Sequence, residues 1–185
     1  MVIFVPSNLR CMGKLELIME TEQVSIYSPK YDGESQSEFA KFLSSNCSHT
    51  HPQLKTFFDA ILSAIEKIQE CGARENLFRP EGGRVKALPM FYTYRRVNRS
   101  VGKIRLYCLC LSERVLIIGN GGVTTAARYD DDSVHLAYVE DLRAIFRQIR
   151  KIVRQAKTDY DDFDALKRII ESITLLPHYE EKSFV

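Results

Sequence analysis

Positive charge is concentrated in one segment of this 185-residue sequence. Residues 84–128 contain nine Lys or Arg side chains and one carboxylate, Glu113, a net charge of +8, whereas the whole chain has a net charge of +2. The nine cations are Arg84, Lys86, Arg95, Arg96, Arg99, Lys103, Arg105, Arg114 and Arg128. This density is typical of proteins that bind an anionic partner, most often a nucleic acid. The alternative is a basic strand face neutralised by acidic neighbours, such as residues 129–141, which hold five acids and no Lys or Arg.

The cysteines and histidines do not form the pattern of a disulfide framework or a metal site. The five cysteines are an odd number, and no secretion signal is recognisable, so we expect reduced thiols and a cytoplasmic location. Cys108 and Cys110 are expected to be small core residues on one face of a strand. The only close histidine pair, His49 and His51, has no second pair of ligands. We therefore predict no metal site and no cofactor.

The segment Gly119-Asn-Gly-Gly122 is a further candidate for phosphate binding. No Gly-Lys-Ser/Thr follows it, and the pattern Gly-x-Gly-x-x-Gly is absent, so it lacks the sequence of either nucleotide-binding loop. We interpret it as a flexible turn that ends the last strand of the sheet.

Length and composition favour one globular domain over residues 1–185. The chain is 45% hydrophobic and 27% charged, and a chain of this length buries roughly 70% of its extended surface without disulfides or metals. No apolar run approaches the roughly 18 residues that span a bilayer. We therefore expect a folded protein without a membrane-spanning segment, and a membrane is not among the expected partners.

Two strands are predicted near the N-terminus. Residues 14–20 and 24–27 alternate in part between apolar and polar side chains, as short strands do. Residues 29–35 are rich in turn-forming side chains and are expected to be a loop. The N-terminal 35 residues are therefore expected to precede the main body of the fold with a strand pair.

Two helices are expected next. A short helix is predicted over residues 38–44. A longer helix begins at Pro52, which suits a first helical turn, and ends at Gly72. Its apolar residues recur at helical spacing and form one face. Residues 73–83 are expected to be a loop.

The hydrophobic period changes in residues 84–119, where β-rich runs are separated by short polar links. This pattern predicts consecutive antiparallel strands. In the run 104–111, the even-numbered residues share one face, and the odd-numbered residues, including Arg105 and Tyr107, share the other. Both faces are largely apolar, so this strand is expected to lie in the centre of the sheet.

Two helices are predicted in residues 133–175 as a C-terminal helical extension. Ser133 is expected to cap the first, whose sides carry Arg and Lys, and the second covers about 160–173. The basic sides of the first helix could bind RNA or an acidic partner, although a solvated face is the commoner outcome. The fold class is therefore predicted as α+β, an antiparallel sheet with helices packed on it.

Four short motifs are similar to the core of the RelE/HigB superfamily of bacterial toxins: Arg84-Val-Lys-Ala-Leu-Pro89, Phe91-Tyr-Thr-Tyr-Arg95, Gly102-Lys-Ile-Arg-Leu-Tyr107 and Val115-Leu-Ile-Ile118. The match covers residues 84–125, and the predicted order of strand, helix, helix and antiparallel strands agrees with it. The resemblance implies a RelE-like fold and a toxin–antitoxin system with a cognate antitoxin protein as partner. Many relatives cleave mRNA on the ribosome without a metal. Others lack ribonuclease activity and poison DNA gyrase.

By position, the resemblance assigns catalytic roles to Lys86, Arg95 and Arg105. The remaining candidates for RNA binding are other cations of the same segment: Arg96, Arg99, Lys103 and Arg128. The family usually has a Glu, a His-Gly pair and a Lys pair at three positions that differ here. These positions hold Thr93, Gly119-Asn120 and Thr124-Thr125. Because the usual terminal cations are missing, a non-catalytic role is favoured more strongly for this sequence than for a typical family member.

Cleavage by a ribose 2′-OH needs a base, an acid for the leaving oxygen, and cations for the charge that builds on phosphorus. Arg95 and Arg105 supply charge and bidentate geometry, and Lys86 supplies charge or acts as a base if burial lowers its pKa. Tyr107 or Tyr129 is a candidate for proton transfer. These groups are expected to converge on one surface. The alternative is that the arginines only brace the strands, which predicts a non-catalytic RelE-like protein that binds RNA, gyrase or an acidic partner.

Overall fold

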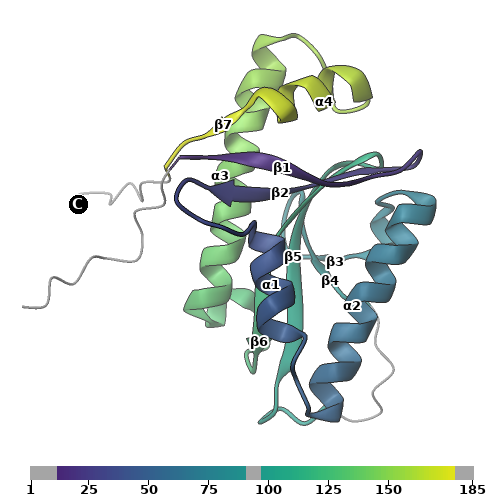
Figure 1. Ribbon diagram of the computed structural model, residues 1–185, viewed down its shortest axis with the longest axis vertical. Coiled ribbons are helices and arrows are strands. Elements are labelled where there is room, and N and C mark those ends of the chain that lie inside the picture. Colours follow the sequence, from purple (N-terminus) through teal and green to yellow (C-terminus); the bar gives the residue numbers. More distant parts are fainter. Residues whose placement is uncertain (1–11, 91–96, 178–185) are drawn as a thin grey trace, which may run out of the picture.

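The computed structural model describes residues 12–90 and 97–177. Within these residues, seven strands form one sheet in the order β3-β4-β5-β6-β2-β1-β7, with helices on both faces (Figure 1). The strands are β1 Gly13–Glu20, β2 Ser25–Tyr31, β3 Arg79–Pro80, β4 Val85–Leu88, β5 Lys103–Ser112, β6 Val115–Thr124 and β7 Thr174–Leu175. The helices are α1 Glu38–Asn46, α2 Pro52–Cys71, α3 Ser133–Gln155 and α4 Phe163–Ser172, with 3-10 turns η1 Glu75–Leu77 and η2 Tyr129–Asp131.

The predicted α+β fold class is confirmed. Strands β4, β5 and β6 follow one another and pair antiparallel, and α1 and α2 precede them as expected. The sequence did not predict that β2 pairs with β6 in parallel. This pairing places the N-terminal strands beside the last strand of the cationic segment, so that one sheet unites both halves of the chain.

Local signals explain where the helices begin and end. Helix α2 has Pro52 in its first turn and stops at Gly72, whose φ of 85° is left-handed and therefore suits glycine. The expected cap of α3 is corrected: the Asp132 side chain, not Ser133, accepts hydrogen bonds from the first free backbone N–H groups. No helix among the described residues is both long and apolar enough to cross a membrane.

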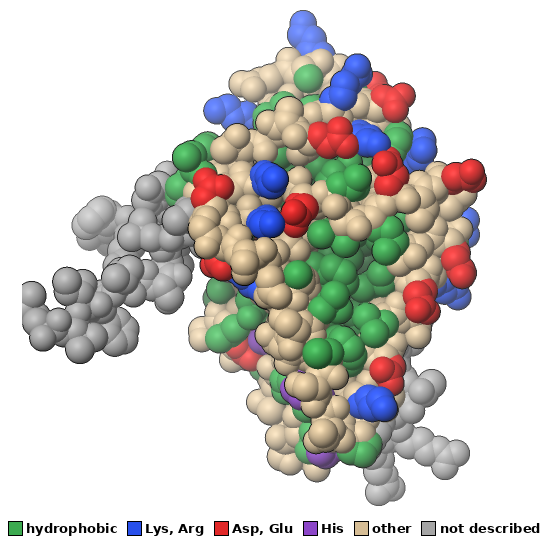
Figure 2. Space-filling model, viewed as in Figure 1, with side chains coloured by type: hydrophobic (Ala, Val, Ile, Leu, Met, Phe, Trp, Pro, Cys, Tyr) green, Lys and Arg blue, Asp and Glu red, His purple; other side chains and the backbone are tan. Residues whose placement is uncertain are grey.

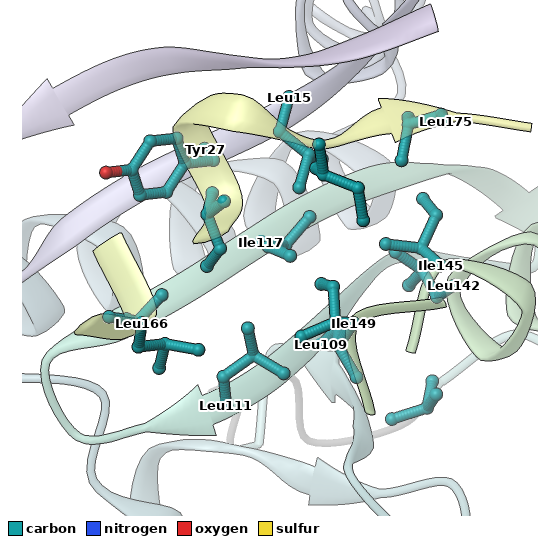
Figure 3. Packing of buried hydrophobic residues seen from close by; sticks show 14 of the residues in the cluster. Leu15, Tyr27, Leu109, Leu111, Ile117, Leu142, Ile145, Ile149, Leu166 and Leu175 are labelled. Carbon is teal, nitrogen blue, oxygen red and sulfur yellow. The ribbon is translucent and has the colours of Figure 1, made fainter. Parts of the chain in front are cut away.

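Each face of the sheet has its own apolar core. Helices α1 and α2 pack on the even-numbered side of β5, which includes Leu106 and Cys108. Helices α3 and α4 pack on the odd-numbered side, where Ile149 lies beside Leu109 and Leu142 belongs to the same core (Figure 3). Strand β5 is therefore buried on both faces, as its alternation predicted. Leu106 and Ile117 are fully buried, as expected.

The glycine-rich segment is strand rather than turn, which corrects the sequence interpretation. Strand β6 continues through it to Thr124, with a register shift between the pairs Cys108–Ile118 and Leu106–Gly121. A Cβ atom at Gly121 would lie 1.9 Å from the backbone oxygen of Arg105. Glycine is needed there because β5 and β6 approach too closely for a side chain.

Other boundaries also differ from those predicted. Strand β2 extends to Tyr31 into the expected loop, and Pro29 is tolerated there because β6 pairs only with residues 25–27 of β2, which leaves one side of Pro29 without a strand neighbour. The expected loop of residues 73–83 contains η1 and β3, and the short strand β7 follows α4 and pairs with β1. Two-residue strands have too few side chains to produce a recognisable alternation.

Four cysteines lie in the described residues, and all four are free thiols. Cys108 is fully buried and Cys110 packs against the same core, as predicted. Burial raises the pKa of the Cys108 thiol, and raises that of Cys110 to about 12. Both side chains therefore stay protonated at neutral pH and behave as small apolar residues.

Candidate anion-binding site

Cations from two strands, β3 and β5, and from helix α3 surround the carboxylate of Glu81. Arg105 Nη1 lies 3.1 Å and Arg79 Nε 3.3 Å from Glu81 Oε1, and Arg143 Nη2 donates to the Glu81 backbone oxygen over 3.4 Å. Lys103, the first residue of β5, lies beside them and is influenced by the charges of Arg105, Arg79 and Glu81. We call these five residues, Arg79, Glu81, Lys103, Arg105 and Arg143, the Glu81 cluster.

The turn between β3 and β4 places Glu81 at the centre of this cluster. Gly82 and Gly83 both have positive φ, 100° and 60°, which lets the chain reverse so that the Glu81 N–H donates to the Val85 oxygen over 3.1 Å. A Cβ atom at Gly82 would lie 3.2 Å from Arg143 Nη2. The glycine therefore also leaves room for the arginine of α3.

The charge around Lys103 is predominantly positive. Burial, followed by repulsion from Arg105 and Arg79, lowers the pKa of Lys103 to about 8, although Glu81 opposes the shift. The Lys103 Nζ lies 3.5 Å from the backbone oxygen of Ala127. An anion beside this ammonium group would relieve the repulsion, so the cluster is electrostatically suited to bind a phosphate or carboxylate.

A group of hydrogen-bonded side chains lies beside the Glu81 cluster on the same face of the sheet. Tyr107 donates its hydroxyl proton to His135 Nδ1 over 2.9 Å, because His135 Nε2 faces the Val123 backbone oxygen at 3.2 Å and must carry the ring proton. Burial lowers the pKa of His135 and raises that of Tyr107. Both groups are therefore neutral near pH 7, and they hold the first turn of α3 onto the sheet.

Asp132 extends this group of hydrogen-bonded side chains. Its Oδ2 accepts a hydrogen bond from the Thr124 hydroxyl over 2.8 Å, and its other oxygen caps α3. Partial burial acts to raise the pKa of Asp132, but the hydrogen bonds from Thr124 and the α3 backbone outweigh it and keep the pKa below its ordinary value. The Asp132 carboxylate is therefore ionised near pH 7 and has a structural role, and it is not a proton donor.

The expected convergence of Lys86 with Arg105 is wrong. Lys86 pairs with Cys108 across β4 and β5, so it lies on the α1/α2 face, where its Nζ is 3.2 Å from Glu75. Arg105 lies on the α3 face with Tyr107. Side chains of a strand alternate between its two faces, and Arg105 is three positions from Cys108, the partner of Lys86, so the two cations lie on opposite faces.

The other predicted residues are distributed as follows. Arg95 and Arg96 lie outside the described residues. Arg99 is exposed in the link before β5, and Arg128 is exposed and paired with Asp130, Nη2 to Oδ2, over 2.7 Å. Lys103 is the one predicted RNA-binding residue that lies in the Glu81 cluster.

Sequence reasoning missed Arg79, Glu81 and Arg143 of the Glu81 cluster, and His135 beside it. Glu81 is 24 residues from Arg105, and Arg143 is 62 residues from Glu81. A clue to Glu81 was the Gly82-Gly83 pair beside it, which indicates a tight turn after a carboxylate. No local signal links His135 to Tyr107, which is 28 residues away.

Comparisons with protein-family models, with curated proteins and with solved structures find no match for this chain.

Proposed function

We propose that the protein is the RelE-like component of a bacterial toxin–antitoxin system, and that it binds RNA in the cytoplasm with a phosphate group at the Glu81 cluster. The observation behind this proposal is the excess of positive charge in the cluster. Arg79, Lys103, Arg105 and Arg143 lie around the Glu81 carboxylate, and Arg143 is also paired with Glu140. Burial, followed by repulsion from Arg105 and Arg79, lowers the pKa of Lys103 to about 8. Phosphate contacts supply most of the affinity of sequence-independent nucleic-acid binding.

A row of arginines on α3 favours an extended polyanion as the ligand rather than an isolated ion. Arg143, Arg147, Arg150 and Arg154 follow at steps of four, three and four along α3, which places them on one side of the helix over about 16 Å. Arg150 and Arg154 approach Tyr160 closely enough to influence its pKa. We call these four residues the basic side of α3; it begins at the Glu81 cluster.

The opposite face is less suited to RNA. Figure 2 shows that the centre of the α1/α2 side is occupied by apolar side chains, with charged groups towards its margins. On this side Lys86 is engaged with Glu75, and Lys41 is engaged with Glu34 and Glu38. RNA is therefore expected on the α3 side.

RNA cleavage is the second candidate function, and the pKa of Lys103 favours it. A lysine with a pKa of about 8 is partly neutral under physiological conditions and can accept a proton. In such a step the 2′-OH would lose its proton to Lys103 Nζ as its oxygen bonds to phosphorus. The bond to the 5′ oxygen would break and that oxygen would take a proton from water, which leaves a 2′,3′-cyclic phosphate and a 5′-OH. Arg79, and Arg105 from behind the site, would stabilise the charge on phosphorus.

Binding without cleavage remains the first proposal because the expected catalytic set is incomplete. Lys86 lies on the other face, and Thr124 stands where a family lysine is usual, with its hydroxyl bonded to Asp132. Arg105 is buried and paired with Glu81, so it contributes charge from behind the site rather than an open guanidinium group.

The binding proposal is tested with the full chain, a fluorescent single-stranded 12-nucleotide RNA and a series of salt concentrations. Arg79→Met with Lys103→Met removes two cations of the cluster, and we expect the salt slope to fall by about 1.4, that is, about 0.7 for each lost phosphate contact. Lys55→Met with Lys67→Met removes two exposed cations from α2 on the opposite face and is the matched control. Equal losses in both double variants, or no binding by the wild type, would refute the proposal.

Cleavage is tested separately with translated mRNA and ribosomes, by detection of cyclic-phosphate ends. Lys103→Arg keeps the positive charge but cannot lose its proton at physiological pH. Cleavage that is lost in Lys103→Arg while RNA affinity is kept would support the catalytic role. RNA binding with no cyclic-phosphate product in the wild type would leave binding as the function.

A further inference from the structure

A cleft of about 590 Å³ lies between α1, the last part of β6 and the first turn of α3. Its walls include Ser45 and Asn46 from α1, Asn120 and Gly122 from β6, and Tyr138 from α3. Sites for small organic ligands are typically about 300–1,000 Å³ in size. The cleft is therefore large enough for one nucleobase with its sugar.

The cleft exists because β6 loses its strand neighbour at this point. Strand β2 pairs with β6 only at residues 115–117, and α1 and α3 flank the rest of β6 (Figure 1). Gly121 and Gly122 have no side chains, so nothing from this part of β6 fills the floor of the cleft. A Cβ atom at Gly122 would meet no heavy atom within 4 Å.

The cleft has no excess of positive charge, unlike the Glu81 cluster. Its lining contains one Lys, Lys41, and one carboxylate, Asp132, and Lys41 Nζ also lies 2.9 Å from Glu38 and 3.3 Å from Glu34. These carboxylates disfavour a second phosphate group. The remaining side chains of the lining are mainly amides, hydroxyls and aromatic rings, which suit an uncharged ligand that forms hydrogen bonds and stacks.

Two amides of the lining are held in fixed orientations. Asn120 Nδ2 donates to Glu38 over 2.8 Å while its Oδ1 accepts from the Gly121 N–H over 2.7 Å. Asn46 Nδ2 donates to the Phe42 oxygen over 2.8 Å, and its Oδ1 lies 3.2 Å from His49 Nε2. Each amide group has further donor and acceptor capacity. Oriented Asn and Gln side chains are the groups that read the edges of nucleobases.

Strand β6 and the first turn of α3 lie between the cleft and the Glu81 cluster. Gly122 lines the cleft and pairs with Arg105 of the cluster. His135 lines the cleft and accepts the hydrogen bond of Tyr107, which lies beside the cluster. An RNA strand that contacts the cluster through a phosphate is therefore expected to reach the cleft with the base of a nearby nucleotide.

We infer that this cleft is a base-recognition pocket for one unpaired nucleotide of the RNA, an inference that depends on the proposed RNA binding at the Glu81 cluster. Single-stranded RNA is read by stacking on aromatic rings and by hydrogen bonds to base edges. The pocket would give the protein a base preference that the phosphate contacts alone cannot supply.

The test compares the full chain with four homopolymeric RNA octamers, of A, C, G and U, by fluorescence anisotropy. We expect the best and worst octamers to differ in affinity by about tenfold, which is within the range for one recognised base. Ser45→Trp adds bulk to the cleft from an exposed position, and Ser63→Trp adds the same bulk on the exposed side of α2 as a control. The preference should fall below about twofold in Ser45→Trp, with an unchanged salt slope, and should persist in Ser63→Trp.

Val134→Trp fills the cleft from its opposite wall, where Val134 is 55% exposed, and repeats the test if Ser45→Trp does not fold. Equal affinities for the four octamers in the wild type, or a preference that survives in folded Ser45→Trp and Val134→Trp, would overturn the base pocket. In those cases the phosphate site of the proposed function would still stand. Failure of every octamer to bind would overturn the proposed function and the pocket together.

Discussion

Arg105 Nη1 lies 3.1 Å from Glu81 Oε1, and both side chains are only 7% exposed. A buried ion pair of this kind joins β5 to the turn before β4. When one partner of such a pair is removed, the other remains as an uncompensated charge with little access to water. The pair therefore has a structural role that must be measured before any loss of function in an Arg105 variant is interpreted.

We predict that Arg105→Met lowers the free energy of unfolding by about 3 kcal/mol, the lower end of the range for a broken buried pair, because Arg79 still neutralises part of the Glu81 charge. The double variant Arg105→Met with Glu81→Met should recover most of this loss, since no buried charge remains. Urea denaturation measures both values. A single variant as stable as the wild type would show that the pair is solvated.

The stability of the protein should rise with pH in the range where Lys103 titrates. The folded-state pKa is about 8, whereas an unfolded lysine has a pKa of about 10.4. Below pH 8 Lys103 is charged in both states, and the penalty for its charge in the fold is constant. Between pH 8 and about 10.4 the unfolded state binds more protons, so stability increases. Lys103→Met should lack this component, which is measured as the difference between the urea denaturation curves of the two proteins.

RNA affinity should show the opposite dependence on pH. A phosphate group favours the charged form of Lys103, so binding is strongest below pH 8 and weakens as the pH rises through the pKa of about 8. Lys103→Arg stays charged over this range and should bind equally well at pH 7 and at about pH 9. A parallel decline in wild type and Lys103→Arg would assign the pH dependence to another group.

Sequence patterns predicted the elements whose signals are local. Pro52 and Gly72 mark the two ends of α2, and the alternation in residues 104–111 predicted a central strand with Arg105 and Tyr107 on one side. These features depend on the conformation of neighbouring residues, which the sequence displays directly.

Features that depend on contacts between distant residues were not predictable in the same way. The end of β6 was misplaced because Gly121 is required by the backbone of Arg105, a contact across two strands. Lys86 and Arg105 were expected together because the register of β4 on β5 is not visible in either motif. The Glu81 cluster was missed because Arg143 joins it from a helix 62 residues further along the chain.

Two neighbouring glycines of β6 should respond very differently to alanine. A Cβ atom at Gly121 would lie 1.9 Å from the Arg105 oxygen, whereas one at Gly122 would meet nothing within 4 Å. We predict that Gly121→Ala destabilises the protein by about 1–3 kcal/mol or more because β5 and β6 must separate. Gly122→Ala should change stability by less than about 0.5 kcal/mol. Thermal denaturation of both variants checks the prediction, and similar values would place the segment in a turn rather than in β6.

Protonation of His135 should destabilise the fold in mild acid. Burial keeps its folded-state pKa below the ordinary value of 6.5, so the unfolded state binds the proton more readily. The contribution to stability is therefore complete above pH 6.5 and is lost as the pH falls from 6.5 through the folded-state pKa. His135→Gln can donate to the Val123 oxygen and accept from Tyr107 without titrating. Compared with this variant, the wild type should lose stability as the pH falls below 6.5, which urea denaturation at a series of pH values measures.

The separation of Lys86 from Arg105 predicts unequal effects of two lysine substitutions on RNA binding. Lys103→Met removes a cation of the Glu81 cluster and should reduce RNA affinity severalfold, with a smaller salt slope. Lys86→Met removes a cation on the α1/α2 face that is already paired with Glu75, and RNA affinity should change by less than about twofold. Circular dichroism confirms folding, and titration of the same labelled RNA compares the two variants. If Lys86→Met weakens binding as much as Lys103→Met does, RNA contacts both faces of the sheet, and the assignment of its site to the α3 side is wrong.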